Sequence, residues 1–319
     1  MSFNESLNLV HFSLNCESMK KLILFFIPFI CVGQLKFLPK SKGEYIEHTY
    51  YSLSYLEDHE QAEWVHYKLT FPMINGSTKR KDNFKKDSKV KTGSASNSDY
   101  YKSGFDRGHL APAGDMKLNS TMMSESFYMS NISPQRASFN RGGWKKLEDL
   151  VRSWASYKTL YVTVAGVLND NNLINIGSNN VTVPSRFYKI IFDPNQNKVI
   201  AFVMPNTKIS GELSDYVVTV DVIENITGID FLSELEDAIE DRIESKIDIY
   251  GWNFNQKGVN KNYKKYSNYD TVSSEQNKVK TLKKSESNIV VRCTAITLKG
   301  AQCKRNASSG STFCWQHKK

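Results

Sequence analysis

Cysteine is absent from the body of this 319-residue chain, because its five cysteines are Cys16, Cys31, Cys293, Cys303 and Cys314. Disulfide bonds therefore cannot hold residues 32–292 together, which excludes a disulfide-rich scaffold for this segment. Its stability must come from a packed core, for which the 40 % hydrophobic and 12 % aromatic content is sufficient.

A long hydrophobic run is also missing. The most apolar stretch, Leu22 to Val32, is far shorter than the roughly 20 apolar residues that a membrane-spanning helix needs. It follows two lysines and precedes the small residue Gly33, an order typical of a secretory signal peptide, with a buried core helix as the alternative. Residues 1–33 are therefore predicted to be an N-terminal extension and a signal peptide that starts at Met19. We expect a secreted or periplasmic bacterial protein whose mature chain has no stable membrane span.

Acidic residues are scarce near the C-terminus. Residues 255–319 hold 14 Lys and Arg against 3 Asp and Glu, whereas the rest of the chain holds 28 against 30. Residues 255–290 are rich in Lys, Asn, Ser and Tyr and poor in aliphatic side chains, which predicts a basic flexible linker. The basic tail fits an anionic partner such as nucleic acid.

Neither an internal repeat nor a regular alternation of strands and helices is found in residues 40–254, which we expect to form the main domain. Apolar residues at spacings of three and four predict helices at 144–156 and 231–247. The mixed order favours an α+β fold with a mixed, largely antiparallel sheet and flanking helices. Runs of β-branched and aromatic residues predict strands at 50–56, 62–70, 159–168, 185–193 and 198–205.

The body lacks H-E-x-x-H or a comparable second-histidine spacing, which argues against a zinc hydrolase. Its most unusual segment is GFDRGHLAPAGDM, residues 104–116, with too little apolar content for a strand and too many breakers for a helix. His109 can take and return a proton near neutral pH, and Arg107 offers a fixed cationic fork that suits a phosphate. Gly108 allows a backbone conformation that other residues resist.

A second polar segment, SPQRASFNRGGWKKLE, covers residues 133–148. Asn140 and Glu148 are eight residues apart, so on one continuous helix they lie about two turns apart on neighbouring faces. Both offer the hard oxygen atoms that Mg²⁺ prefers. The alternatives are a helix N-cap for Asn140 and a solvated helix face for Glu148.

Together, the Asp106-Arg107-Gly108-His109 motif and the second segment resemble the DNA/RNA non-specific endonuclease family, which includes secreted bacterial nucleases and mitochondrial endonuclease G. The resemblance covers about residues 45–250 and leaves out the signal peptide, linker and tail. It implies a ββα-metal (His-Me finger) core, in which a strand pair carrying the histidine packs on the helix that carries the metal ligand.

The resemblance also implies roles for individual residues. His109 is expected to be the general base, Asn140 the direct ligand of Mg²⁺ (or Mn²⁺), and Glu148 a ligand through water that completes the catalytic set with Arg107. Arg107 and, by a looser alignment, Arg80 are expected to contact the phosphate.

The implied activity is metal-dependent hydrolysis of phosphodiester bonds in DNA and RNA. The alternative is a non-catalytic protein that binds nucleic acid through its basic tail. The sequence leaves open the biological role, the preference between DNA and RNA, an inhibitor partner and the oligomeric state, for which a homodimer is one option.

Residues 291–319 carry four potential metal ligands in the pattern C-x9-C-x10-C-x2-H: Cys293, Cys303, Cys314 and His317. Only the last spacing is typical of zinc ligands, but three thiols and one imidazole make a complete tetrahedral set. A segment this small needs such a cross-link, because apolar burial alone cannot fold it. We expect a small domain with structural Zn²⁺; the alternatives are a disulfide with one unpaired thiol, and disorder.

Overall fold

The computed structural model describes residues 35–40 and 42–254, together with Cys293, Ala295, Cys303, Arg305, Thr312, Cys314 and His317. The predicted signal peptide within residues 1–33 and the predicted linker at 255–290 lie outside the described residues. No helix of the described part combines the length and the apolar character needed to cross a bilayer.

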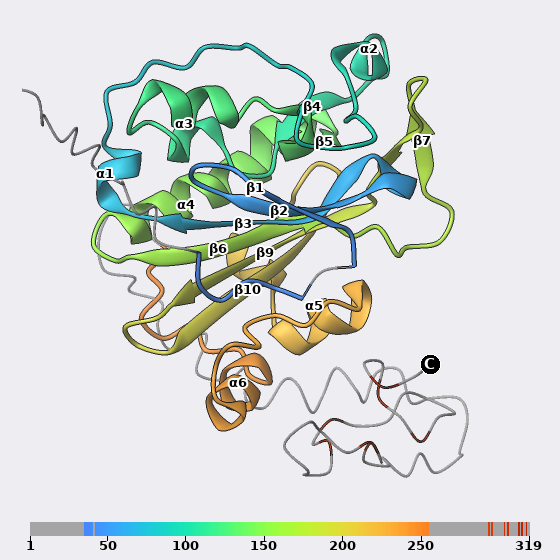
Figure 1. Ribbon diagram of the computed structural model, residues 1–319. Helices are drawn as coiled ribbons and strands as arrows, with labels where there is room; N and C mark the ends of the chain where they lie inside the picture. The colour runs from blue at the N-terminus through green and yellow to red at the C-terminus, as the bar shows by residue number, and fades with distance from the viewer. Residues whose placement is uncertain are drawn as a thin grey trace, which may run out of the picture. The chain divides into compact units, whose positions relative to one another are not determined.

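Seven strands form the central sheet, in the order β1-β2-β3-β6-β9-β10-β11 (Figure 1). Every neighbouring pair in this sheet is antiparallel. The predicted α+β class with a largely antiparallel sheet is therefore confirmed. The strands are β1 (Glu44–Glu47), β2 (Ser52–Leu56), β3 (Gln61–Leu69), β6 (Leu160–Gly166), β9 (Arg186–Asp193), β10 (Lys198–Pro205) and β11 (Val217–Val218).

Both faces of this sheet are covered (Figure 1). On one face lie α3 (Ser120–Glu125), α4 (Lys145–Ala155) and the strand pair β4 (Asp106–His109) and β5 (Ile132–Gln135). On the other face lie α5 (Val220–Thr227) and α6 (Asp237–Glu244). Because β6 and β9 are buried along almost their whole length, apolar side chains fill most positions on both of their faces, and polar and apolar residues do not alternate regularly.

The remaining elements are short. They are α1 (Phe71–Ile74), α2 (Asn97–Tyr100), β7 (Ile174–Ile176), β8 (Val181–Val183), the 3₁₀ turns η1 (Glu57–His59), η2 (Ala113–Asp115), η3 (Met129–Asn131) and η5 (Leu213–Tyr216), and the wide helical turn η4 (Phe139–Trp144), which leads directly into α4.

The helix predicted over residues 144–156 agrees with α4, whose buried side chains include Leu147, Leu150, Val151 and Trp154. These residues follow the spacing of three and four that places them on one helix face. The apolar face of α4 packs on the sheet, so the opposite face of the helix is directed away from the core.

The helix predicted over residues 231–247 is wrong in its extent, because α6 covers only Asp237–Glu244. Leu232 has a positive φ of 53°, which an α-helix does not allow. Phe231 and Leu232 are nevertheless buried. Their apolar spacing therefore reflects a packed loop that precedes a two-turn helix.

The expectation that composition excludes a strand from residues 104–116 is also wrong, since β4 lies there and pairs antiparallel with β5. Gly108 is opposite Ser133 in this pair. A Cβ atom on Gly108 would lie 2.2 Å from the side chain of Gln135. The φ angle of Gly108 is not positive, so its backbone conformation is one that other residues can adopt. Glycine at this position leaves the space that the Gln135 side chain occupies, and it is not required by an unusual backbone conformation.

Candidate active site

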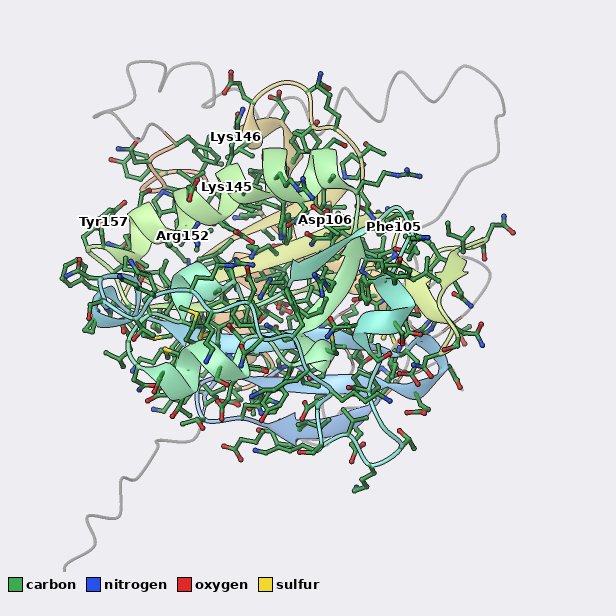
Figure 2. All side chains as sticks on the ribbon, turned by 90° about the horizontal axis from the view of Figure 1, so that it is seen from above. Phe105, Asp106, Lys145, Lys146, Arg152 and Tyr157 are labelled. Carbon is green, nitrogen blue, oxygen red and sulfur yellow. The ribbon has the colours of Figure 1, made fainter. Side chains whose placement is uncertain are left out.

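A cleft of about 1280 Å³ opens between β4, the turn η4 and the first part of α4. Figure 2 looks onto this layer, with Asp106 and Phe105 of the β4 region and Lys145 at the start of α4 labelled. The cleft is lined by all five residues predicted to act in catalysis or phosphate binding: Arg80, Arg107, His109, Asn140 and Glu148. Polar and charged groups that converge in one concavity are expected of a substrate site.

His109 ends β4 and is only 7 % exposed. Its ring lies edge-on to Phe127 at a centroid distance of 4.8 Å and packs against Phe84 at 5.4 Å. The Nε2 atom is buried and has no hydrogen-bond partner among the described residues. Burial, assisted by the cations Arg80 and Arg107, lowers the pKa of His109 to about 3. The imidazole is therefore neutral near pH 7 and has a nitrogen that can accept a proton.

Arg107 is exposed and lies at the cleft wall, with its guanidinium carbon 4.2 Å from the centroid of the Phe84 ring. Its Nη1 donates a hydrogen bond to Oδ1 of Asn97 at 2.7 Å. The stacking and the hydrogen bond restrict the guanidinium, and its remaining donors can meet an anion in the cleft.

Arg80 lines the same cleft, with its side chain 55 % exposed. Its guanidinium carbon lies 5.2 Å from the centroid of the Phe127 ring, and its Nε donates to Asp82 at 2.7 Å. Arg80 and Arg107 therefore each contact one of the two phenylalanines that pack against His109.

Asp106 joins β4 to η4. Its Oδ2 accepts a hydrogen bond from Nδ2 of Asn140 at 2.9 Å, and its two oxygens accept from Nε and Nη2 of Arg141 at 2.8 and 2.6 Å. Burial alone would raise the pKa of Asp106, but the bonds from Arg141 and Asn140 hold that pKa below its ordinary value. Since an ionised carboxylate only accepts hydrogen bonds, the amide nitrogen of Asn140 faces Asp106 and its oxygen is the atom left for a cation.

Neither alternative role holds for Asn140 and Glu148. Asn140 lies inside η4, where Ser138 is the N-cap, and the side chain of Glu148 is only 14 % exposed. The assumption of one continuous helix is also wrong, because Gly142 between them has the non-helical φ and ψ of −109°. Both residues still line one cleft, since the kinked turn directs Asn140 toward β4.

Charged side chains, among them Lys189 and Arg152, surround the carboxyl group of Glu148. Burial raises the pKa of Glu148 to about 7, against the opposing effect of the cations Lys189 and Arg152. Lys189 on β9 is 1 % exposed, with its Nζ 4.7 Å from the centroid of the Trp144 ring. Arg152 donates to Oδ1 of Asp115 at 2.7 Å. Nη2 of Arg152 lies 4.0 Å from Oε2 of Glu148, so charged groups of both signs surround the Glu148 carboxyl at the cleft.

Several residues that shape this site were not predicted, among them Lys189, Phe84 and Phe127. Lys189 carried a weak signal, as a lone cation within an apolar strand. Phe84 and Phe127 carried none, because they come from a loop and from the segment after α3, and only the tertiary structure places them against His109.

The donors in the cleft fit a hard divalent cation. An amide oxygen and one carboxylate are a small oxygen set, as Mg²⁺ uses when it keeps most of its water ligands. The soft thiol ligands of the described residues lie in the tail instead.

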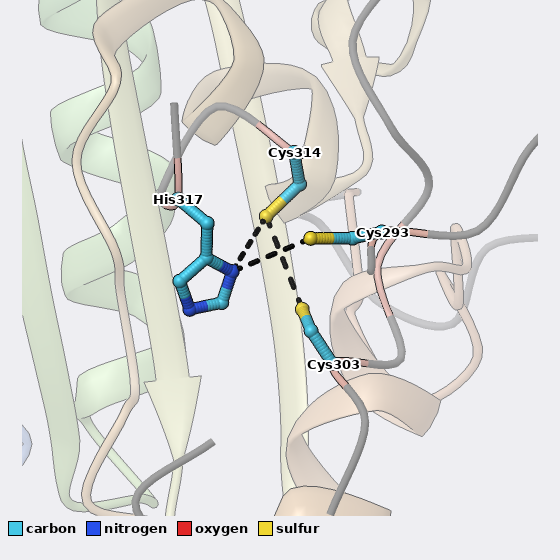
Figure 3. A group of neighbouring side chains, drawn as sticks. All are labelled: Cys293, Cys303, Cys314 and His317. Carbon is cyan, nitrogen blue, oxygen red and sulfur yellow. Dashed lines mark hydrogen bonds between the residues drawn. The ribbon is translucent and has the colours of Figure 1, made fainter. Parts of the chain in front are cut away.

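That tail cluster brings together the four predicted zinc ligands (Figure 3). Cys303 Sγ lies 3.9 Å from Cys314 Sγ, and Nδ1 of His317 lies 3.3 Å from Cys314 Sγ and 3.4 Å from Cys293 Sγ. All four ligand atoms are within 4.8 Å of one another, and the three described cysteines form no disulfide.

Residues 33–238 match the model of the DNA/RNA non-specific endonucleases. The chain belongs to this endonuclease family. It is 34 % identical over 218 residues to the mitochondrial nuclease EXOG of Danio rerio, covering 62 % of this chain and 64 % of that protein. It is 35 % identical over 213 residues to a nuclease of Nostoc sp., covering 62 % of this chain and 76 % of that protein.

Among solved structures, the chain is similar to EndoG in a crystal structure of the EndoG/EndoGI complex, which was described as showing the mechanism of EndoG inhibition. The TM-score is 0.56 at 32 % identity, with 61 % of this chain and 87 % of that chain covered. The predicted family, a family of nucleic-acid hydrolases, is therefore confirmed, and so is the ββα-metal core built from β4, β5 and α4. The family match ends before the tail.

The lowered pKa of His109 predicts how the free energy of unfolding of this endonuclease-family chain changes as the pH falls. The pKa is about 3 in the folded state and 6.5 ordinarily, so between these values the unfolded state binds more protons and stability falls as the pH falls. His109→Gln removes this loss. Between pH 7 and about pH 4.5, the free energy of unfolding of the variant should fall by about 2 kcal/mol less than that of the wild type in urea titrations. His59→Gln, at a partly exposed histidine, should give a smaller difference. If the free energy of unfolding fell equally in His109→Gln and in the wild type, the lowered pKa of His109 would be contradicted.

Proposed function

We propose that this protein is a secreted, Mg²⁺-dependent endonuclease that hydrolyses phosphodiester bonds in both DNA and RNA. The observation that carries the proposal is the content of one cleft: a neutral histidine with an unpartnered nitrogen, two exposed arginines, and an amide oxygen near a carboxylate. Each of these groups has a distinct task in phosphodiester hydrolysis.

The chain's own residues perform the proton transfer and the phosphate binding. Nε2 of His109 takes a proton from water as the water attacks phosphorus and the P–O bond to the leaving oxygen breaks, and the imidazolium then returns its proton, through solvent, to that oxygen. Arg107 and Arg80 bind the phosphate oxygens, whose negative charge increases in the transition state. The bound phosphate also offsets the two arginine charges that lower the pKa of His109, so the histidine becomes a stronger base when substrate is present.

Asn140 and Glu148 are the residues that would hold Mg²⁺, with Mn²⁺ as the alternative. When bound, the cation supplies Lewis-acid stabilisation of the negative charge that develops on the phosphate. The neutral amide of Asn140 leaves the positive charge of such a cation undiminished. Asp106 fixes this amide, and because Arg141 neutralises Asp106, the fixing carboxylate adds little repulsion toward an anionic substrate.

The proposed secretion rests on the predicted signal peptide within residues 1–33, and the proposed nuclease domain on residues 40–254. Two relatives, nuclease EXOG of Danio rerio and endonuclease G of Homo sapiens, are named as mitochondrial, so secretion is a proposal for this chain and not a property of all its relatives. The N-terminal sequence of the exported protein, recovered from the culture medium, tests cleavage after Gly33.

The nuclease proposal is tested by incubating the purified chain with plasmid DNA and with RNA, in Mg²⁺ and in EDTA. We expect Mg²⁺-dependent cleavage of both, and a loss of kcat of about 10²–10⁴-fold in His109→Ala, because the general base is removed. His59→Ala, outside the cleft, is the matched control and should keep full activity. Cleavage that survives EDTA or His109→Ala would overturn the mechanism. Binding without cleavage would instead support the non-catalytic alternative.

Asp106 is proposed to be a positioning residue that acts through Asn140. Asp106→Ala leaves the Asn140 amide unrestrained, so we expect about a 10–100-fold lower kcat/KM and a higher Mg²⁺ concentration for half-maximal rate. Arg141→Met keeps the bond between Asp106 and Asn140 and should change the Mg²⁺ dependence much less. An unchanged Mg²⁺ dependence in Asp106→Ala would show that Asp106 serves folding alone.

We also propose that Cys293, Cys303, Cys314 and His317 hold a structural Zn²⁺. With bonds of about 2.3 Å to sulfur and 2.0–2.1 Å to nitrogen, a tetrahedral zinc site has ligand separations of about 3.8 Å between sulfurs and about 3.6 Å between sulfur and nitrogen. The observed separations of 3.9, 3.4 and 3.3 Å support this site. A disulfide would require sulfurs about 2.05 Å apart.

Metal analysis of the full chain should give one equivalent of zinc in the wild type and a large loss in Cys314→Ser, because one of four ligands is removed. Thr312→Ala, at an exposed neighbour, should keep the zinc. A wild-type chain purified under reducing conditions that holds no zinc at one equivalent would refute the site.

A further inference from the structure

The zinc cluster fixes the position of one arginine. The backbone N–H of Cys293 donates to the carbonyl of Arg305 at 2.8 Å, and the N–H of Cys303 donates to the carbonyl of Ala295 at 2.7 Å. This antiparallel pairing places Arg305 opposite a zinc ligand and two residues beyond another. Any ion that holds Cys293 and Cys303 together therefore also fixes the backbone from which Arg305 extends.

The side chain of Arg305 contacts a group of buried acids on and near α5 and α6 of the nuclease fold. Glu224 on α5, Asp230 after it, and Glu240 and Glu244 on α6 are 1 %, 5 %, 9 % and 1 % exposed. Buried carboxylates are unfavourable unless a cation pairs with them. Burial and repulsion between the acids raise the pKa of Glu240 to about 8 and that of Glu244 to about 11, so their ionised forms are unfavourable here, and Arg305 acts in the opposite direction on both.

Arg305 supplies positive charge to these acids. Its Nη1 lies 2.7 Å from Oε2 of Glu224, and its Nη2 lies 3.4 Å from Oδ1 of Asp230 and 3.5 Å from Oε1 of Glu240. The Arg305 side chain is only 22 % exposed. Lys40 also pairs with Asp230, at 2.6 Å, but its side chain is 68 % exposed. Arg305 is therefore the cation that is least accessible to water and that pairs with three of the acids.

We propose that the zinc-held tail is an intramolecular latch: Zn²⁺ fixes the segment that carries Arg305, and Arg305 docks into the Glu224, Asp230 and Glu240 cluster and so stabilises the nuclease fold. The latch rests on the proposed zinc site and does not depend on the proposed nuclease activity. Because α5 and α6 cover the face of the sheet opposite to β4, β5 and α4, docking at this cluster leaves the catalytic cleft open (Figure 1). Zinc in the tail thus contributes to stability without entering the reaction.

The experiment is thermal unfolding of the full chain, in excess Mg²⁺, with and without a zinc-selective chelator. Chelation should lower the Tm of the wild type by about 5 °C or more, since it releases the cation of a buried acidic cluster. Arg305→Met should lower the Tm similarly while still holding one equivalent of zinc, and chelation should then have little further effect. Arg242→Met removes an exposed arginine from α6 itself and is the matched control, with an unchanged Tm and an unchanged chelator effect.

A second variant guards against a general folding defect in Arg305→Met. Adding Glu240→Gln to Arg305→Met removes one uncompensated acid, so part of the lost Tm should return. The latch is overturned if zinc-loaded Arg305→Met melts at the wild-type temperature, or if chelation lowers its Tm as much as that of the wild type. A wild-type chain without zinc overturns the zinc site and the latch together, whereas loss of cleavage with an intact latch concerns the nuclease proposal alone.

Discussion

Asp106 accepts hydrogen bonds from Asn140 and from Arg141, and this contact joins the two halves of the catalytic cleft. The strand β4 carries Asp106 and His109, while η4 carries Asn140, and no continuous element connects them. The orientation of the Asn140 amide therefore depends on a carboxylate three residues before the proposed general base. One ionised side chain fixes the spatial relation between the base and the proposed cation ligand.

The surroundings of His109 combine two effects that both lower its pKa. Phe84 and Phe127 bury the ring and keep it neutral, and the adjacent arginines add positive charge that disfavours protonation further. In an empty cleft this environment gives a weak base. In the proposed mechanism, an anionic phosphate between Arg80 and Arg107 would reverse part of this electrostatic effect and so couple the basicity of the histidine to the presence of substrate.

The two faces of the sheet differ in how their buried charges are neutralised. At the cleft, Lys189, Glu148, Arg152 and Asp115 bring charges of both signs together, and all four belong to the nuclease fold itself. On the face covered by α5 and α6, acids predominate and a guanidinium from outside the family match completes the cluster. Through Arg305, the tail that carries the Cys293, Cys303, Cys314 and His317 cluster thereby contacts this fold.

The sequence was enough to predict α4 and β10, because their apolar spacing is strong and local, and the two polar motifs were enough to predict the family. It was not enough to predict β4, which is stabilised by pairing with β5 and by the space that Gly108 leaves for Gln135, and not by its own propensity. The length of α6 also depended on a loop, since the backbone of Leu232 cannot be helical. The neutrality of His109, the orientation of Asn140 and the partners of Arg305 arose only in the tertiary structure, because each depends on burial and charge brought together from segments distant in the chain.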